Sequence, residues 1–380
     1  MKFSITNLKI SLLLIVVLIP FSLSHSLVNG EYNVGTKSFR WTDSSRIDPY
    51  YSGYRIVNVQ VWYPVDVSEN NNNCKRSGYY NNIESVWKEL PGWSEEDQML
   101  VLNIKTNGLI NAPISDQKIS FPLLIFSPTL GGNTSLYTYY AEALAQLGFV
   151  VAGVNHLYES EFVLNEESKL FISDLSFHDS LKLLEIPSQI TAEEYRRVKG
   201  VRQKVLAEDM IFTLNKLAEV NSQEFKNKMD LNRVGVWGHS IGGAAAIYAS
   251  ILDDRFKAVI DIDGTPPTLA LDGIEVPFMF IEDLPDYKNH DGYMKQYIRR
   301  NEFCKNVKGD AYRVLISGAD HNSFLDINYY GAESEPDKQE ALSVINETLK
   351  YITLFFNIYL NKENLDIEEL NTNKLEVVKF

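Results

Sequence analysis

The stretch RVGVWGHSIGGAAAIYAS, residues 233 to 250, has the pattern of a strand, a tight turn and a helix in direct succession. The apolar run from Val234 to Trp237 predicts a buried strand, and the small residues after Ser240 predict a helix that packs closely on a sheet. Between them, GHSIG fits the pattern G-x-S-x-G, whose glycines leave room for a serine held in a strained turn. The sequence therefore predicts that Ser240 is a nucleophile at the end of a strand.

Strand and helix patterns alternate on both sides of this stretch, which indicates a doubly wound, mostly parallel α/β sheet in one domain, residues 27–380. Two segments, about 66–118 and 157–190, interrupt the alternation and are expected to be lid-like insertions or ordinary surface elaborations. The first contains a short helix that starts near Ser94, with Asp97 placed for a capping box. Strands are expected at 54–63, 121–126, 149–154, 233–237, 256–262, 276–281 and 312–316, the first of them antiparallel and half-exposed, and helices at 136–147, 192–217, 241–252 and 336–360.

A serine hydroxyl needs a histidine as base, and the chain should supply it after the serine. His321 lies in SGADH, directly after the strand expected at 312–316, where a loop at the carboxyl edge of the sheet would carry it. His290 lies in a polar stretch and is the less favoured candidate. His156 ends a strand on the same edge, so we expect it to support the site structurally.

The acid that orients the histidine has four candidates at the ends of two strands. Asp261 and Asp263 flank Ile262, while Glu282 and Asp283 end the next strand. Asp263 is favoured because it lies just past its strand and before a glycine, on a loop that can turn toward the histidine. The alternation of side chains between the two faces of a strand does not by itself decide which carboxylate reaches the histidine, so the other three remain alternatives.

The composition excludes several classes of protein. With 45% hydrophobic residues in 380 the chain is globular, and a net charge of -14 argues against nucleic acid as a partner. Metal-ligand spacings such as His-x-x-x-His are absent from the sequence, so neither a metal nor another cofactor is expected. Cys74 and Cys304 are too few for a disulfide scaffold, and whether they pair is left open.

The first 26 residues have the layout of a secretory signal peptide. Lys2 and Lys9 precede the apolar run 10–23, and small residues follow it. The run is shorter than a membrane span, and no second apolar stretch of about 20 residues follows. We therefore expect a secreted or periplasmic protein.

Several stretches together resemble the platelet-activating-factor acetylhydrolases and their secreted bacterial relatives, which have the α/β-hydrolase fold. GHSIGGA at 238–244 is common to many esterases, but its combination with the spacing from Arg255-Phe256 to Asp263 is more specific. The oxyanion loop departs from the family, because Ser127-Pro128-Thr129 precedes Leu130 where His-Gly is usual. The other resembling stretches are VWYP at 61–64, FPLLIFSPTLG at 121–131, the segment 149–160 and GADHNSF at 318–324.

The resemblance implies Ser240 as nucleophile, Asp263 as acid and His321 as base, with oxyanion amides from Leu130 and Ile241. It implies a serine carboxylic-ester hydrolase that releases short sn-2 acyl chains from platelet-activating factor or oxidised phospholipids. The expected partners are a small ester or phospholipid and, transiently, a lipid surface, with no obligatory protein partner. Alternatives are a cutinase-like or dienelactone-hydrolase-like esterase, or an inactive binding protein with the same fold.

Overall fold

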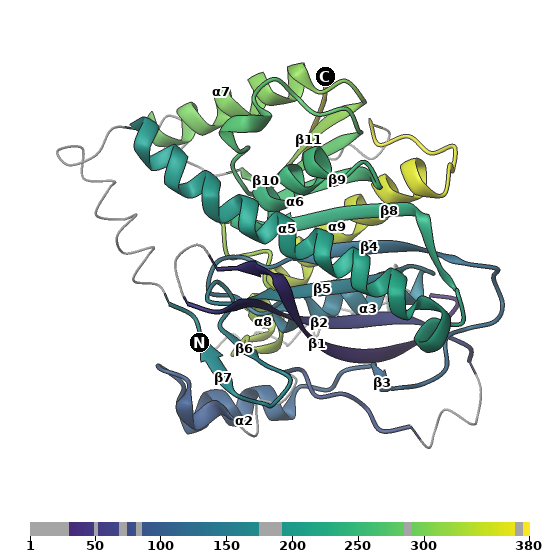
Figure 1. Cartoon of the computed structure of the whole chain (residues 1–380). Helices are drawn as coiled ribbons and strands as arrows, with labels where there is room; N and C mark the ends of the chain where they lie inside the picture. Colours follow the sequence, from purple (N-terminus) through teal and green to yellow (C-terminus); the bar gives the residue numbers. More distant parts are fainter. Residues whose placement is uncertain are drawn as a thin grey trace, which may run out of the picture.

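The strand that carries the GHSIG turn lies in the middle of a ten-stranded sheet (Figure 1). The computed structural model describes residues 30–48, 52–67, 74–80, 86–174, 192–284, 291–368 and 375–380, so the expected signal peptide and His290 lie outside the described residues. The strands of this sheet are β1 (Asn33–Ile47), β2 (Tyr54–Val65), β3 (Leu109–Ile110), β4 (Phe121–Ser127), β5 (Val150–His156), β8 (Met229–His239), β9 (Phe256–Ile262), β10 (Phe278–Leu284), β11 (Ala311–Ser317) and β12 (Leu375–Lys379).

The strand order is β12-β11-β10-β9-β8-β4-β5-β2-β1-β3. The six strands from β11 to β5 are parallel, while β2, β1 and β12 each pair antiparallel with a neighbour. Parallel strands bring their carboxyl ends to one edge, so the loops after β4, β8, β9 and β11 meet there. This topology confirms the predicted doubly wound, mostly parallel α/β sheet.

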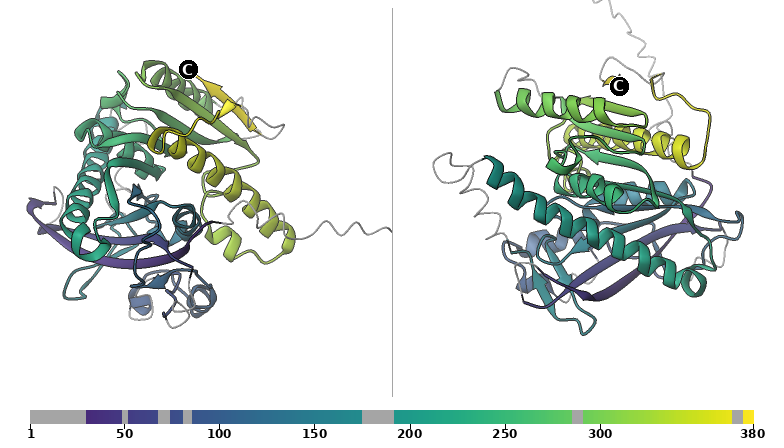
Figure 2. Two further views of the ribbon diagram at one scale, coloured as in Figure 1. Left: turned by 90° about the vertical axis from the view of Figure 1, so that its right-hand side faces the viewer. Right: turned by 45° about the horizontal axis from the view of Figure 1, so that its top comes forward.

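Helices cover both faces of the sheet (Figure 2). The long α5 packs on one face together with α6 and α7, and α3 and α9 pack on the other. Within the described ranges, no helix combines the length and apolarity needed to cross a membrane. The helices are α2 (Glu95–Asn103), α3 (Thr138–Gln146), α5 (Ala192–Phe225), α6 (Ile241–Leu252), α7 (Asp291–Asn306), α8 (Ile327–Tyr330) and α9 (Glu335–Leu360), and the short 3-10 turns are η3 (Trp87–Glu89), η4 (Thr134–Tyr137) and η5 (Thr268–Ala270).

Strand β2 is antiparallel as predicted, but the expectation that it is half-exposed is wrong. Its residues from Arg55 onward are almost all buried, because α3 contacts β2 from one side and α5 from the other. The polar strand β1, the helix α7 and the strand β12 were not predicted. Cys74 and Cys304 are free thiols in the structure.

The two insertions pack on each other beside the carboxyl edge of the sheet. In the first, Ser94 and Asp97 form the predicted capping box at the start of α2. In the second, β6 (Phe162–Leu164) and β7 (Leu170–Ile172) form a hairpin. Apolar side chains of both insertions share one cluster, against which Ile327 of α8 also packs. The described parts of the insertions therefore lie next to the element that follows the His321 loop.

Candidate active site

Ser240 occupies the turn between β8 and α6 in a strained backbone conformation. Its φ is +59° and its ψ is -119°, a region that residues other than glycine rarely adopt. The turn is closed by Gly238 and Gly242, because a Cβ added at Gly238 would lie 2.3 Å from the Gly242 carbonyl carbon. The Ser240 amide donates to the Ile262 carbonyl at 2.8 Å, which ties the turn to the end of β9. The serine thus has the predicted elbow geometry.

His321, on the loop after β11, lies beside Ser240. Its Nε2 is 3.0 Å from the Ser240 Oγ, and its Nδ1 is 2.5 Å from the Asp263 Oδ2. The hydrogen bond to Asp263 raises the pKa of His321, outweighing the lowering caused by partial burial. With Nδ1 donating to the carboxylate, Nε2 is left to accept the serine proton. The loop itself is shaped by Asp320, whose carboxylate accepts from the Ser323 amide.

Asp263 lies on the loop after β9, with a φ of +49°, and its amide donates to the Ile281 carbonyl at 2.8 Å. Arg300 of α7 binds its other carboxylate oxygen, with Nη2 3.1 Å from Oδ1. Burial would raise the pKa of Asp263, but the His321 hydrogen bond and the Arg300 charge outweigh it and hold that pKa below its usual range. The carboxylate is therefore charged where it meets the imidazole.

The other three acid candidates have different partners. Asp261 is fully buried beneath α6, where its Oδ1 accepts from the Gly264 amide at 2.8 Å and burial raises its pKa well above the usual range. Glu282 is bound by Arg300 and Arg313. Burial raises the pKa of Asp283 to about 7. Among these four carboxyl groups, it is Asp263 that accepts the hydrogen bond from His321 Nδ1.

The loop after β4 lies against the start of α6. A Cβ added at Gly242 would be 2.3 Å from the Ser127 carbonyl oxygen and 2.6 Å from that of Pro128, so the two backbones are in close contact. The Leu130 amide makes no backbone hydrogen bond with another described residue. Ile241 is the first residue of α6, where an amide has no acceptor within the helix. The structure therefore brings the two expected oxyanion donors to neighbouring backbone segments.

The sequence did not predict how the unusual loop with Pro128 is held. The Thr129 amide donates to the Tyr137 hydroxyl at 3.1 Å, and that hydroxyl lies 2.8 Å from Nδ1 of His239. Because Tyr137 accepts from Thr129, its own proton is free for His239, which burial keeps neutral by lowering its pKa to about 3. Neither Tyr137 nor Arg300 belongs to a motif, so no local pattern could have identified them.

Among the residues that the structure describes, no group of three or more His, Cys, Asp and Glu side chains is arranged to hold a metal ion. The chemistry available at the sheet edge is that of a hydroxyl, an imidazole, carboxylates and backbone amides.

The chain is similar to members of one known family. A family model described as platelet-activating factor acetylhydrolase, isoform II, matches residues 22–333. The platelet-activating factor acetylhydrolase of Gallus gallus is 24% identical over 257 residues, covering 60% of this chain and 60% of the relative. That of Canis lupus familiaris is 25% identical over 236 residues, covering 58% of this chain and 51% of the relative. The chain thus matches between half and three fifths of the length of these relatives.

A solved structure is similar over nearly the whole fold. The ferulic acid esterase from Streptomyces cinnamoneus superposes with a TM-score of 0.72 at 22% identity, covering 92% of this chain and 97% of that chain. The match confirms an α/β-hydrolase-like fold. With a family model that spans most of its length, the chain belongs to the platelet-activating factor acetylhydrolase isoform II family.

Proposed function

We propose that the protein is a serine carboxylic-ester hydrolase with Ser240 as nucleophile, His321 as base and Asp263 as acid. The observation that carries the proposal is a continuous line of two hydrogen bonds. Ser240 Oγ lies 3.0 Å from His321 Nε2, and His321 Nδ1 lies 2.5 Å from Asp263 Oδ2. The line starts at a strained elbow, which is where α/β hydrolases hold their nucleophile.

In the first half of the reaction, Ser240 Oγ attacks the ester carbonyl carbon while His321 Nε2 takes the hydroxyl proton. Asp263 stabilises the imidazolium that forms. The tetrahedral intermediate carries its negative charge on the former carbonyl oxygen, and the Leu130 and Ile241 amides would donate to that oxygen. The start of α6 adds a favourable field there. Collapse then expels the alcohol, which takes the proton from His321, and leaves an acyl-enzyme.

In the second half, His321 takes a proton from water, and the hydroxide attacks the acyl carbon. The second tetrahedral intermediate uses the same amides, and its collapse returns the proton to Ser240 and releases the carboxylic acid. Each step uses groups of this chain and water alone.

For the substrate, we propose short-acyl esters, with release of an sn-2 acetyl or oxidised acyl chain from a phospholipid. The support is the family and the names of the relatives, which are acetylhydrolases; one is a probable 1-alkyl-2-acetylglycerophosphocholine esterase from Arthroderma benhamiae. Contact with a lipid surface would be transient. We also propose secretion or periplasmic location after cleavage near residue 26, with residues 27–380 as one catalytic domain.

The test is hydrolysis of p-nitrophenyl acetate combined with labelling by a fluorophosphonate probe. We expect the wild type to hydrolyse the ester and to take up one label, and Ser240→Ala to lose both while keeping its circular dichroism spectrum. A wild type that is neither labelled nor active would instead be the inactive binding protein of the same fold. Activity retained by Ser240→Ala would end the proposal. A panel with feruloyl, cutin-type and dienelactone substrates separates the other esterase alternatives.

A further inference from the structure

A second set of serine, histidine and aspartate lies inside the protein, at the base of the loop that carries Leu130. Ser127 Oγ is 2.9 Å from His156 Nε2, and His156 Nδ1 is 3.0 Å from Asp209 Oδ2. Ser127 ends β4, His156 ends β5 and Asp209 lies on α5. All three are buried, with at most 1% of each residue exposed. Ser127 therefore cannot meet an ester, and the set needs another explanation.

The protons of this set have one consistent arrangement. Burial would raise the pKa of Asp209, but the charges of Arg55 and Arg46 and the hydrogen bond from His156 keep it a carboxylate. Burial lowers the pKa of His156, so its ring is neutral. His156 must then donate from Nδ1 to Asp209 and accept at Nε2, which makes the Ser127 hydroxyl the donor. The direction of every hydrogen bond from α5 to β4 is thereby determined.

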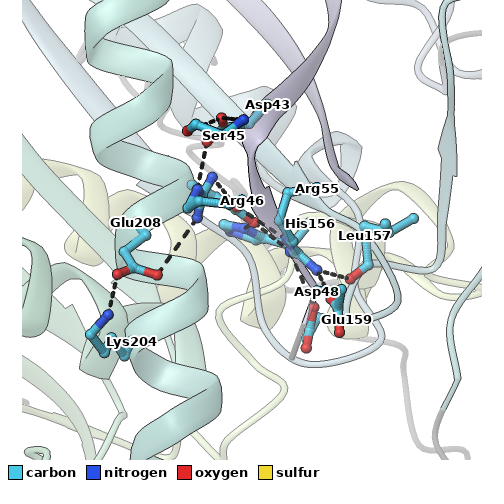
Figure 3. Close-up of polar contacts among 11 residues, drawn as sticks. Asp43, Ser45, Arg46, Asp48, Arg55, His156, Leu157, Glu159, Lys204 and Glu208 are labelled. Atoms are coloured by element: carbon cyan, nitrogen blue, oxygen red, sulfur yellow. Dashed lines mark hydrogen bonds and ion pairs between the residues drawn. The ribbon is translucent and has the colours of Figure 1, made fainter. Parts of the chain in front are cut away.

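A buried charge cluster anchors this set (Figure 3). Arg55 of β2 lies between Asp209 and Asp48, with Nη2 2.5 Å from Asp209 Oδ2 and Nη1 2.5 Å from Asp48 Oδ2. Its Nη1 also donates to the Leu157 carbonyl at 3.0 Å. Arg46 binds the other oxygen of Asp209 at 2.8 Å. Removing one member of such a buried ion pair leaves an uncompensated charge, so the cluster resists displacement.

The same cluster also reaches the far end of the loop. Glu159 pairs through its side chain with Arg202 and lies 3.7 Å from Arg55. Its backbone carbonyl accepts from the Gly131 amide at 2.8 Å, one residue after Leu130. The segment from Ser127 to Gly131 is thus tied to one rigid group of charges at both of its ends.

We propose that Ser127 and His156 are positioning residues that hold the Leu130 amide in place for the developing oxyanion. The proposal rests on the proposed function, because it assigns Leu130 as a donor. A donor must lie within a few tenths of an ångström of its productive place, and a loop fixed at both ends satisfies this without the His-Gly sequence usual in the family. The buried Ser127–His156–Asp209 set supplies the first fixed point and the Glu159 carbonyl the second.

The first test is the Ser127→Ala variant, which removes the donor to His156. We expect kcat on p-nitrophenyl acetate to fall about 10- to 100-fold with little change in KM, since a misplaced donor costs less than a lost one. The acid limb of the pH profile should stay where it is in the wild type, because His321 remains the base. Thr213→Val is the matched control: it removes a buried hydroxyl from α5, one turn beyond Asp209, that has no hydrogen-bond partner among the described residues. It should keep the wild-type kcat.

A second pair of variants works even if Ser127→Ala fails to fold. In His156→Gln, the side-chain amide reaches the position of Nε2 and can accept from the Ser127 hydroxyl. In His156→Asn, the shorter side-chain amide reaches only the position of Nδ1. We expect Gln to retain more of kcat than Asn. Wild-type kcat in Ser127→Ala, equal kcat in the two His156 variants, or a shifted acid limb would each overturn the proposal.

Hydrogen exchange tests the positioning role of Ser127 separately from the proposed esterase function, because the measurement does not depend on enzyme activity. The amides of residues 129–132 should exchange faster in Ser127→Ala than in the wild type or in Thr213→Val. Unchanged exchange would overturn the positioning role even in an active esterase. A wild type without hydrolysis or fluorophosphonate labelling would overturn the esterase function, while the exchange comparison would still decide whether the loop is held by Ser127.

Discussion

Arg300 and Asp263 form a buried ion pair at the edge of the candidate active site, with Nη2 3.1 Å from Oδ1. His321 Nδ1 donates a hydrogen bond to Oδ2, the other oxygen of the same carboxylate. Arg300 also binds Glu282 and the Gly264 carbonyl, so its guanidinium is fixed on three sides. A fixed positive charge next to the acid influences how readily the imidazole takes a proton.

The pH dependence of hydrolysis should report this charge. The hydrogen bond to Asp263 raises the pKa of His321 and Arg300 lowers it, and His321 acts as a base only when neutral. We expect the acid limb of kcat/KM above the ordinary imidazole pKa of about 6.5, and at still higher pH in Arg300→Gln. Stopped assays from pH 5 to 9 would measure it. Arg299→Gln is the control, and a limb that moves to lower pH in Arg300→Gln would contradict the prediction.

The identity of the acid can be tested by four amide substitutions. Asp263→Asn should lower kcat by roughly four orders of magnitude, because the imidazole loses its partner and its tautomer. Asp261→Asn and Asp283→Asn should cost far less, since neither side chain is the hydrogen-bond partner of His321. Glu282→Gln should mainly lower the free energy of unfolding, by about 3 to 5 kcal/mol, because it removes the carboxylate that pairs with Arg313 and one of the two that pair with Arg300. Near wild-type kcat in Asp263→Asn would show that the acid is another residue.

Gly242 should tolerate no side chain. In Gly242→Ala the new methyl group would lie 2.3 Å from the Ser127 carbonyl oxygen, so the oxyanion loop must move away from the elbow. We expect kcat to fall by about 100-fold or more. The comparison is Gly200→Ala on α5, where the added Cβ would meet no described atom outside its own stretch of helix within 4 Å. Its free energy of unfolding, measured by urea denaturation, should rise by about 0.5 to 1 kcal/mol. Unchanged kcat in Gly242→Ala would mean that the loop is not close-packed in solution.

Acyl-chain preference follows from the family assignment. We expect kcat/KM to be higher for acetate and butyrate esters than for long-chain fatty acyl esters. A series of p-nitrophenyl esters of two to sixteen carbons would measure it. A preference for the long chains would point to an acyl tunnel beneath the inserted segments.

Metal removal should leave hydrolysis unchanged, since the proposed mechanism uses a hydroxyl, an imidazole and a carboxylate. Assays before and after dialysis against EDTA would test this. Activity lost on chelation and restored by zinc or calcium would count against the serine mechanism.

The residues whose positions follow from local sequence were predicted well. Ser240 lies in the GHSIG motif, between a strand pattern and a helix pattern, and His321 follows closely after another strand pattern. Because the strands are parallel, the topology places both residues at one edge of the sheet. Asp263 was harder to predict, because Asp261 lies only two residues away. The position at which β9 ends decides which of the two carboxylates can turn toward His321. Here the strand ends at Ile262, and Asp263 adopts a positive φ that turns its side chain toward His321.

The supporting residues could not be predicted, because their partners are distant in sequence. Arg300 and Asp263 are 37 residues apart in the sequence, and Arg55 and Asp209 are 154 residues apart. Neither pair follows a spacing rule; each depends on where two elements cross in the folded chain. His156 was expected to support the site, but its partners Ser127 and Asp209 emerge only from the packing of β4, β5 and α5.

The short strand β12 has a consequence for handling the protein. It pairs antiparallel with β11, whose residues Ala311–Ile316 are buried, and α9 and β12 both lie beyond the part of the chain that the family model matches. Without residues 375–380, β11 would present unpaired amides and carbonyls to solvent and could join the same edge of a second molecule. Shortened versions of this chain would therefore be prone to aggregation during purification, even though every residue of the proposed chemistry is still present.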